Sequence, residues 1–306
     1  MTATVDPVSA RRRALGVSAD LIAATLWGFT GIIVTYASTP AVVLTFYRLW
    51  ISVALMLLVL LLQGKRVSRP ALVLAAPAGV LLGVNLTCYV FAFRLTKIAD
   101  ASVIGVLQPG LVLIPAALFF KEEIGVREVL LTAVAIAGVA GVVLGTGFGI
   151  GAHWRGDLLA AIGTLAFAGY WVFAKSARRR IPTSEFMFGV WLSAAVAVTP
   201  AALISRESFA VSPGRAWLWI IALAVVPGVG HILMNWGHRF VDASVSAVIS
   251  ILNAPVAAVA ALVILGQALS PFQIGCGIVA VVAIALVARG RPGRAEEAGD
   301  PVAVSE

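Results

Sequence analysis

One four-residue motif, Asp-Ala-Ser-Val, occurs twice in this chain, at residues 100–103 and again 142 positions later at residues 242–245. Pro40 has its counterpart in Pro182 at the same interval. Both copies lie in almost uninterrupted apolar sequence, so the repeat indicates a duplicated membrane unit. Two copies of a membrane unit that bind one solute between them are a common construction of secondary transporters.

The composition is that of a protein that crosses a membrane many times. Hydrophobic residues make up 61% of the 306 positions, and charged residues make up only 12%. Apolar runs of the length of a transmembrane helix follow one another along the chain. Stretches such as residues 124–146 do not alternate between apolar and polar positions, which excludes a transmembrane β-barrel. We therefore expect an all-α polytopic membrane protein.

Ten segments are apolar and long enough to cross a hydrocarbon core about 30 Å thick. We expect these spans at residues 17–37, 41–62, 70–93, 98–120, 124–146, 157–175, 184–204, 216–237, 241–266 and 271–288. Each copy of the repeat then holds five spans, and because five is odd, the second copy must enter the bilayer upside down relative to the first. The expected fold is ten transmembrane helices arranged as two inverted five-helix repeats.

These spans divide the chain into five parts. We expect a cytoplasmic N-terminal tail at 1–16, a first five-helix repeat at 17–146, a glycine-rich linker at 147–156, a second five-helix repeat at 157–288 and a cytoplasmic C-terminal tail at 289–306. The last segment is polar enough that we expect it to be disordered.

The basic residues predict that both termini are cytoplasmic. In that orientation sixteen of the 22 lysines and arginines flank the cytoplasmic ends of spans, five flank the outer ends, and Arg48 lies within a span. Cytoplasmic loops of membrane proteins carry such an excess of positive charge. We interpret the net charge of +8 as topology signals and contacts with anionic membrane lipids, and not as a nucleic-acid surface. The expected location is the plasma (inner) membrane.

Polar side chains within spans are candidates for a solute site, because they are costly in lipid. Asn85 and Tyr89 lie four residues apart and share a helical face, and so do His231 and Asn235. We expect these two pairs to face each other across a central cavity. The alternative is that they form interhelical hydrogen bonds that hold the bundle together.

Aromatic and amide side chains in matching spans extend this set. Aromatic residues far from the membrane interface, beyond the belt where they usually anchor helices, offer an apolar wall for an organic solute, with ordinary core packing as the alternative. Amides beside prolines can satisfy the backbone carbonyl that a proline frees, or bind a solute. The predicted substrate-binding residues are Trp27, Asn85, Tyr89, Gln108, Tyr170, Trp171, His231, Asn235 and Asn253.

Arg48 allows two interpretations. It could reach the outer rim of the membrane or a structural partner there, or it could form a mouth that attracts anions. The carboxylates, Asp20 among them, are placed by sequence at span ends, so His231 is the one titratable group within a span that could carry protons near neutral pH. Cys88 and Cys276 lie in apolar spans without metal-ligand spacing, so we expect no disulfide, metal or cofactor.

The order and spacing of several short motifs resemble the EamA branch of the drug/metabolite transporter (DMT) superfamily over about residues 17–288. The matching residues are Leu26-Trp27-Gly28, Arg48, Ala101-Ser102 followed by Pro109, Glu123, and Ala243-Ser244 followed by Pro255. The resemblance implies a ten-helix carrier with a cavity lined mainly by the third, fourth, eighth and ninth helices. It also implies a solute among amino acids, other metabolites and drug-like compounds.

Two positions depart from that family pattern. Gly266-Gln267 stands where the family often has Gly-Glu, and Val190 stands where Arg48 would recur in the second half. The two halves have diverged at these positions, so equal roles are not expected there.

We expect a secondary transporter, an exporter of a small organic metabolite such as an amino acid or drug-like compound, that works by alternating access. The chain has no Walker A motif, so it does not hydrolyse ATP itself. A membrane-embedded enzyme acting on a lipid-linked substrate is disfavoured, because the three histidines are scattered and neither HExxH nor GxSxG occurs. A non-transporting membrane sensor is also disfavoured, because the inverted duplication is typical of transporters.

Overall fold

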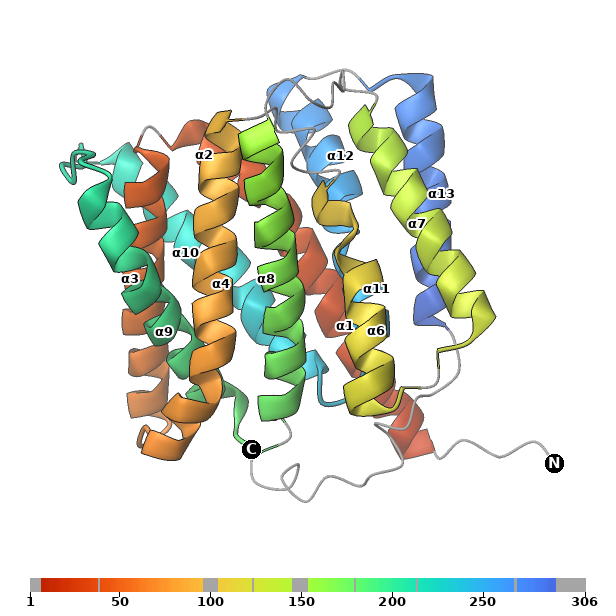
Figure 1. Cartoon of the computed structure of the whole chain (residues 1–306), viewed down its shortest axis with the longest axis horizontal. Coiled ribbons are helices and arrows are strands. Elements are labelled where there is room, and N and C mark those ends of the chain that lie inside the picture. The colour runs from red at the N-terminus through yellow and green to blue at the C-terminus, as the bar shows by residue number, and fades with distance from the viewer. Residues whose placement is uncertain are drawn as a thin grey trace.

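A computed structural model describes residues 7–37, 39–95, 104–122, 124–144, 154–178, 180–212, 214–266 and 269–289. Throughout these residues the regular structure is helical, and the helices stand side by side in one bundle (Figure 1). The helices are α1 (Pro7–Gly28), α2 (Thr30–Tyr36), α3 (Ala41–Leu62), α4 (Arg69–Leu95), α6 (Gln108–Phe120), α7 (Val126–Leu144), α8 (Trp154–Arg178), α9 (Thr183–Ile204), α10 (Arg215–Gly237), α11 (Ala243–Ser250), α12 (Asn253–Leu265) and α13 (Pro271–Ala288).

Eight stretches of the described chain are long and apolar enough to cross a membrane. They are α1 with α2, α3, α4, α8, α9, α10, α11 with α12, and α13. A helix satisfies its own backbone hydrogen bonds, which is why it can cross lipid that offers no polar partner. Many leucine, valine and isoleucine side chains point out of the bundle, where a lipid environment accepts them. The chain is a multi-pass membrane protein.

The observed bounds agree with most of the expected spans. α3 covers the expected 41–62, whereas α1 begins at Pro7, well before the expected start of the first span. α8 begins at Trp154 and so takes in the last part of the expected linker. The first Asp-Ala-Ser-Val copy, Glu123, most of the linker and nearly all of the C-terminal tail lie outside the described residues.

The two expected interruptions are present. α6 begins at Gln108 after a turn at Leu107, and a two-residue turn separates α11 from Asn253 at the start of α12. Pro109 falls in the first turn of α6, where a residue without an N–H group is tolerated. The expected fourth and ninth spans are therefore interrupted beside Gln108 and Asn253 in the part of the chain that the structure describes.

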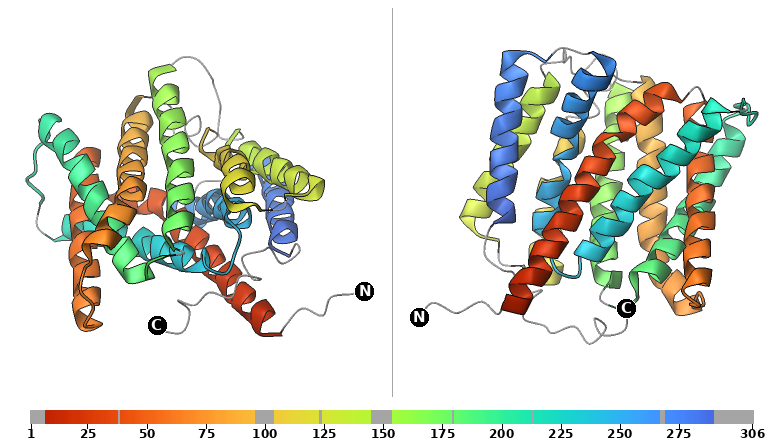
Figure 2. Two further views of the ribbon diagram at one scale, coloured as in Figure 1. Left: turned by 60° about the horizontal axis from the view of Figure 1, so that its bottom comes forward. Right: turned by 180° about the vertical axis from the view of Figure 1, so that it is seen from behind.

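The first helix of each half packs antiparallel against the third helix of the other half. α1 lies against α10, and α8 lies against α4 (Figure 2). The closest contacts give the directions: Asp20 meets Gly237, Trp27 meets Gly230, Tyr89 meets Gly163 and Leu81 meets Gly169. In each pair the residue numbers rise along one helix where they fall along its partner, so the two helices are antiparallel.

Two further pairs of matching helices pack directly on each other. α7 and α13 are antiparallel, because Gly138 meets Ala280 and Gly141 meets Cys276. α3 and α9 are antiparallel too, since Trp50 donates to Thr199 of α9 and the earlier Tyr47 donates to the backbone oxygen of Phe209, beyond the end of α9. Matching helices of the two halves therefore run in opposite directions through the bundle.

Both described ends of the chain lie at one end of the bundle, the lower end in Figure 1. Val17 in the first half of α1 and Val287 in the last turn of α13 pack in one apolar cluster with Val245. This is the arrangement that an even number of membrane crossings produces. The end of the bundle that holds Val17 and Val287 is called the terminal end below.

Close packing of α4 on α9 depends on Gly79. A β-carbon at this position would lie 2.6 Å from the Cβ of Ser193 and 2.6 Å from the backbone oxygen of Val190. We predict that Gly79→Ala lowers the free energy of unfolding by about 1–3 kcal/mol, because backbone atoms must move apart. Thermal unfolding in detergent measures the effect.

Gly275→Ala is the matched control, because nothing lies within 4 Å of its β-position on α13. This variant is expected to keep the wild-type unfolding temperature. Equal unfolding temperatures for both variants would contradict the close approach of α4 and α9.

Candidate functional site

Five rings from four helices meet in the interior of the bundle. We call them the aromatic cluster: Trp27 of α1, Phe167 and Tyr170 of α8, Trp191 of α9 and His231 of α10. The ring centroid of His231 lies 4.8 Å from Trp27, 5.2 Å from Trp191, 6.0 Å from Tyr170 and 6.4 Å from Phe167. These are contact distances for aromatic rings. The histidine is the centre of the cluster.

Helix α10 lets the aromatic cluster form because it carries small residues before the histidine. Gly230 has no side chain at the point where Trp27 crosses α10, and a β-carbon there would lie 2.8 Å from the indole nitrogen. The Nε1 of Trp27 donates to the backbone oxygen of Pro227 at 3.1 Å. The indole is thereby fixed against α10, and its plane is tilted by 51° from that of His231.

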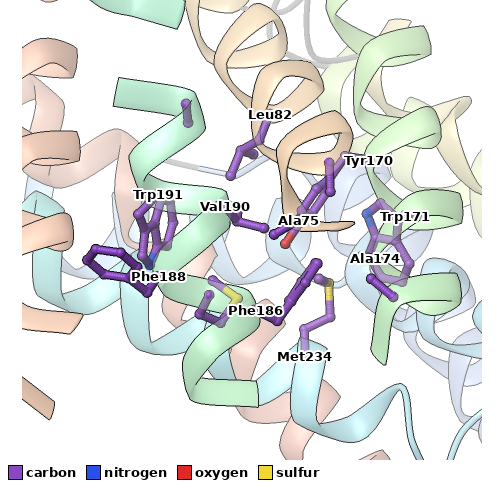
Figure 3. Close-up of a cluster of buried hydrophobic side chains, with 14 of the residues drawn as sticks. Ala75, Leu82, Tyr170, Trp171, Ala174, Phe186, Phe188, Val190, Trp191 and Met234 are labelled. Atoms are coloured by element: carbon purple, nitrogen blue, oxygen red, sulfur yellow. The ribbon is translucent and has the colours of Figure 1, made fainter. Parts of the chain in front are cut away.

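Asn235, one turn after His231, joins α10 to α8. Its Nδ2 donates to the hydroxyl of Tyr170 at 2.6 Å and to the backbone oxygen of His231 at 2.8 Å. The side chain is fully buried. Figure 3 shows Tyr170 in this interior, together with Trp191 from α9 and Met234 from α10.

Several polar atoms here have no partner among the residues that the structure describes. They are the Nδ1 of His231, the Oδ1 of Asn235 and the Nε1 of Trp171. A buried polar group without a hydrogen bond costs about 1–3 kcal/mol. Three such atoms in one region are what a binding site for a polar solute would contain when no solute is bound.

Arg48 of α3 is also buried between helices of the bundle. Its side chain is 7% exposed, and the Nε finds no hydrogen-bond partner within the described chain. Its positive charge acts on His231. Helix α3 packs against α9 and α10. Burial between helices does not give the depth of Arg48 in a membrane, so both expectations for it, the outer rim or a structural partner there and the anion-attracting mouth, stay predictions.

Asn85 and Tyr89 meet α8 and not α10. The Nδ2 of Asn85 donates to the backbone oxygen of Gly163 at 2.9 Å, and the hydroxyl of Tyr89 lies 2.8 Å from the Oγ1 of Thr164. These partners precede Tyr170 by six or seven residues, which is about 10 Å along a helix. The pair makes interhelical hydrogen bonds, and the structure does not bring it against His231 and Asn235.

The remaining predicted residues lie at other interfaces. Trp171 packs on His238 at the end of α10, with ring centroids 4.8 Å apart, and it also meets Phe167 at 6.2 Å, so it lies at the edge of the aromatic cluster. The backbone oxygen of Asn253 lies 3.0 Å from the β-position of Gly28, where α12 approaches α1. Of the nine predicted residues, the structure thus brings together Trp27, Tyr170, His231 and Asn235 at the centre of the cluster, with Trp171 at its edge.

Gln108 meets its own counterpart in the second half. The Oγ of Ser250 donates to the Oε1 of Gln108 at 3.3 Å, and the two residues stand 142 positions apart, the interval of the repeat. Equivalent positions of two copies can touch only at the axis that relates the copies. The broken helices α6 and α11 therefore meet near that axis.

Two rings of the aromatic cluster are absent from the sequence prediction. Phe167 lies three residues before Tyr170, so helical spacing alone could have placed it on the same face. Trp191 gives no such signal, because nothing in the sequence shows which face of α9 meets α10.

A polar network closes the terminal end of the bundle. Asp20, placed at a span end by sequence, is in fact only 3% exposed, because α1 begins at Pro7 and carries this residue into the interior. Its Oδ2 accepts a hydrogen bond of 2.5 Å from the Oγ of Ser246 on α11. Its Oδ1 has no partner among the described residues.

Glu122 supplies the N-terminal cap of α11. Its carboxylate accepts hydrogen bonds from the backbone nitrogens of Ala243 and Ser244 at 2.8 and 3.1 Å, and from the Oγ of Ser244 at 2.7 Å. A carboxylate at a helix N-terminus satisfies free N–H groups and the helix dipole. Asp242, the residue in the capping position, makes no such bond with its side chain.

Two buried cations cap the other helix at this end. The Nζ of Lys175 donates to the backbone oxygen of His238 at 2.6 Å and also to that of Val241. The Nε of Arg178 donates to the backbone oxygen of Asn235 at 3.1 Å. Carbonyl groups at a helix C-terminus lack partners within the helix, so the end of α8 satisfies the end of α10.

These charges shift the titration of neighbouring groups. Burial holds the pKa of His238 well below 6.5, and the positive charges of Lys175 and Arg178 lower it further, so this histidine is neutral at physiological pH. Burial and the carboxylate of Glu122 raise the pKa of Asp242 to about 6, against the opposing effect of Lys175.

The raised pKa of Asp242 predicts a pH-dependent stability. A carboxyl group with a higher pKa in the folded chain weakens folding as it ionises, so its cost grows between about pH 4 and pH 6. Asp242→Asn cannot ionise. We predict that it unfolds at a higher temperature than wild type at pH 7, by about 1–3 kcal/mol of stability, and that the difference disappears near pH 4.

Thermal unfolding of both proteins across that pH range measures the effect. A difference that stays constant with pH would contradict the placement of Asp242 beside Glu122.

The chain is similar to known proteins along most of its length. The sequence profile of a family described as "EamA-like transporter family" matches residues 14–144 and again residues 154–289. The pseudopaline exporter CntI of two Pseudomonas aeruginosa strains is 24% identical over 212 residues, which cover 69% of this chain and 73% of the relative. A solved structure described only as "Crystal structure of protein" has a TM-score of 0.76 at 24% identity and covers 90% of this chain and 96% of that chain.

Proposed function

Because the chain belongs to the EamA-like transporter family, we propose that it is a secondary transporter that exports a small organic solute across the plasma membrane. The aromatic cluster carries the proposal, because it sets unpaired polar atoms among buried rings between helices of both halves. Such a mixture of apolar surface and a few polar groups is typical of sites for small molecules. The relatives named as pseudopaline exporters support the outward direction.

The proposed architecture is ten membrane spans in two inverted five-helix repeats. The opposite directions of matching helices and the match of one family profile to each half support it. Halves of this kind can rock about a shared site and expose it to one side of the membrane at a time. The hydrogen bond between Gln108 and Ser250 lies where such an axis would pass.

Trp27, Tyr170, His231 and Asn235 are the proposed centre of the binding site, together with Phe167 and Trp191. The rings would stack on apolar parts of the solute, and the amide and imidazole would orient its polar groups. We propose that the remaining candidates line the path to the centre, since all of them except Trp171 lie where a helix of one half meets a helix of the other. These residues are Asn85, Tyr89, Gln108, Trp171 and Asn253.

The network at the terminal end is the proposed cytoplasmic gate. Lys175 joins α8 to α10 within the second half. Asp20 holds α1 to α11 and Glu122 holds the chain after α6 to α11, so these two residues link the first half to the second. A solute can enter from this side only if these links part. The excess of basic residues at this end supports its placement in the cytoplasm, with both chain termini on that side.

The experiment begins with the metabolites exported by cells with and without the gene. The solutes that differ are then followed in vesicles that contain the purified protein. We predict that Trp27→Ala and Asn235→Ala each lower the flux by about tenfold or more, because each removes a contact of about 1–1.5 kcal/mol or leaves polar groups unpaired.

Phe173→Ala is the matched control, since this ring is on α8 beside the aromatic cluster but is 45% exposed on the outside of the bundle. It is expected to transport like wild type. Normal flux in correctly folded Trp27→Ala and Asn235→Ala proteins would contradict the proposed site, and product formation without solute movement would contradict transport.

A further inference from the structure

Arg48 is a buried charged side chain with no opposite charge beside it among the described residues. Within the described residues its guanidinium makes no hydrogen bond or ion pair, and no carboxylate acts on it electrostatically. A charged side chain within a transmembrane helix is costly unless it finds a partner. An uncompensated charge in this place calls for an anion that the protein itself does not supply.

The position of Arg48 places that anion beside the aromatic cluster. Ser52, one turn later on the same face of α3, lies 4.0 Å from the β-position of Gly228 on α10. His231 follows Gly228 by three residues and so shares its helical face. The positive charge of Arg48 acts on His231, whose Nδ1 is also unpaired.

We infer that Arg48 binds the carboxylate of the transported solute, which is therefore an organic carboxylate with an aromatic or apolar body. This inference rests on the proposed function and names its solute class. The guanidinium presents N–H donors in a planar fork that fits the two oxygens of a carboxylate. The rings around His231 accommodate the body of the solute, and the unpaired Oδ1 of Asn235 accepts a hydrogen bond from a donor such as its amino group.

A single negative charge fits this site better than a phosphate dianion. Arg48 is the one cation that acts on His231 among the described groups. Lys175 and Arg178 bind backbone carbonyls at the end of α10 and belong to the proposed gate. One uncompensated cation matches one carboxylate, whereas a phosphate ester would leave a second negative charge buried.

The test compares acids with their uncharged amides. The purified full-length protein is mixed with L-phenylalanine or L-phenylalaninamide, with 3-phenylpropionate or 3-phenylpropionamide, and with phenyl phosphate, and binding is followed by the shift in unfolding temperature. Wild type is expected to bind at least one acid about tenfold or more tightly than its amide. Arg48→Gln is expected to bring that ratio close to one, and Arg48→Lys to leave an intermediate ratio.

Arg215→Gln is the matched control, because it removes the same charge from an exposed position at the start of α10. It should keep the wild-type ratio. The unliganded Arg48→Gln protein should unfold at the wild-type temperature or above, since the change removes a buried charge that has no partner.

Four results would overturn the inference. The first is that wild type binds no acid more tightly than its amide, and the second is that the ratio of acid to amide affinity is unchanged in Arg48→Gln. The third is that wild type binds phenyl phosphate more tightly than 3-phenylpropionate. The fourth is that Arg48→Gln and Arg48→Met both fail to fold. Export of metabolites by cells is a separate readout. A difference in export without selectivity for acids would refute the inference alone, and binding of acids without any flux would refute transport alone.

Discussion

A polar group buried in this bundle has no water to bind, so it must find a partner in the protein or serve a ligand. This constraint separates the polar residues into two sets. Lys175, Arg178 and Glu122 satisfy the ends of helices, and Asn85 with Tyr89 ties α4 to α8. The second set has unpaired atoms, and it includes Arg48, His231, Asn235 and Trp171, which lie in the interior that we propose for the solute. The free-energy cost of burying an unpaired polar group therefore accounts both for the contacts that hold the helices together and for the site that we propose for the solute.

The duplication determines how the helices that bury these polar groups are arranged. Matching helices run in opposite directions, and equivalent positions meet at Gln108 and Ser250, so each half faces the other across an axis. The side chains at equivalent positions of the two halves nevertheless differ in type and in the contacts that they make. Tyr89 and His231 stand one repeat apart, yet the first bonds a threonine of α8 whereas the second lies among rings. Arg48 likewise has Val190 as its counterpart, which leaves one guanidinium for the whole site.

The sequence predicts the helices well because the length of an apolar run and the cost of unpaired backbone fix where a helix can lie. α3 has the expected bounds for this reason. The sequence fails where the answer depends on which helices touch. Asp20 lies near the start of an apolar run, but the helix begins thirteen residues earlier, and α10 and α11 cover the carboxylate. Trp191 contacts His231 because the face of α9 that carries it points towards α10. A single sequence does not show which face of a helix points towards a given neighbour.

The central claim is that two antiparallel halves expose one shared site to each side in turn, and distances at the two ends of the bundle test it most directly. Spin labels at Gln63 and Lys121 report on the terminal end, and labels at Ser208 and Ser270 report on the opposite end, in protein whose two cysteines are replaced. The account predicts that a transported solute changes the two distances in opposite directions. Two distances that stay fixed, or that lengthen and shorten together, would contradict it.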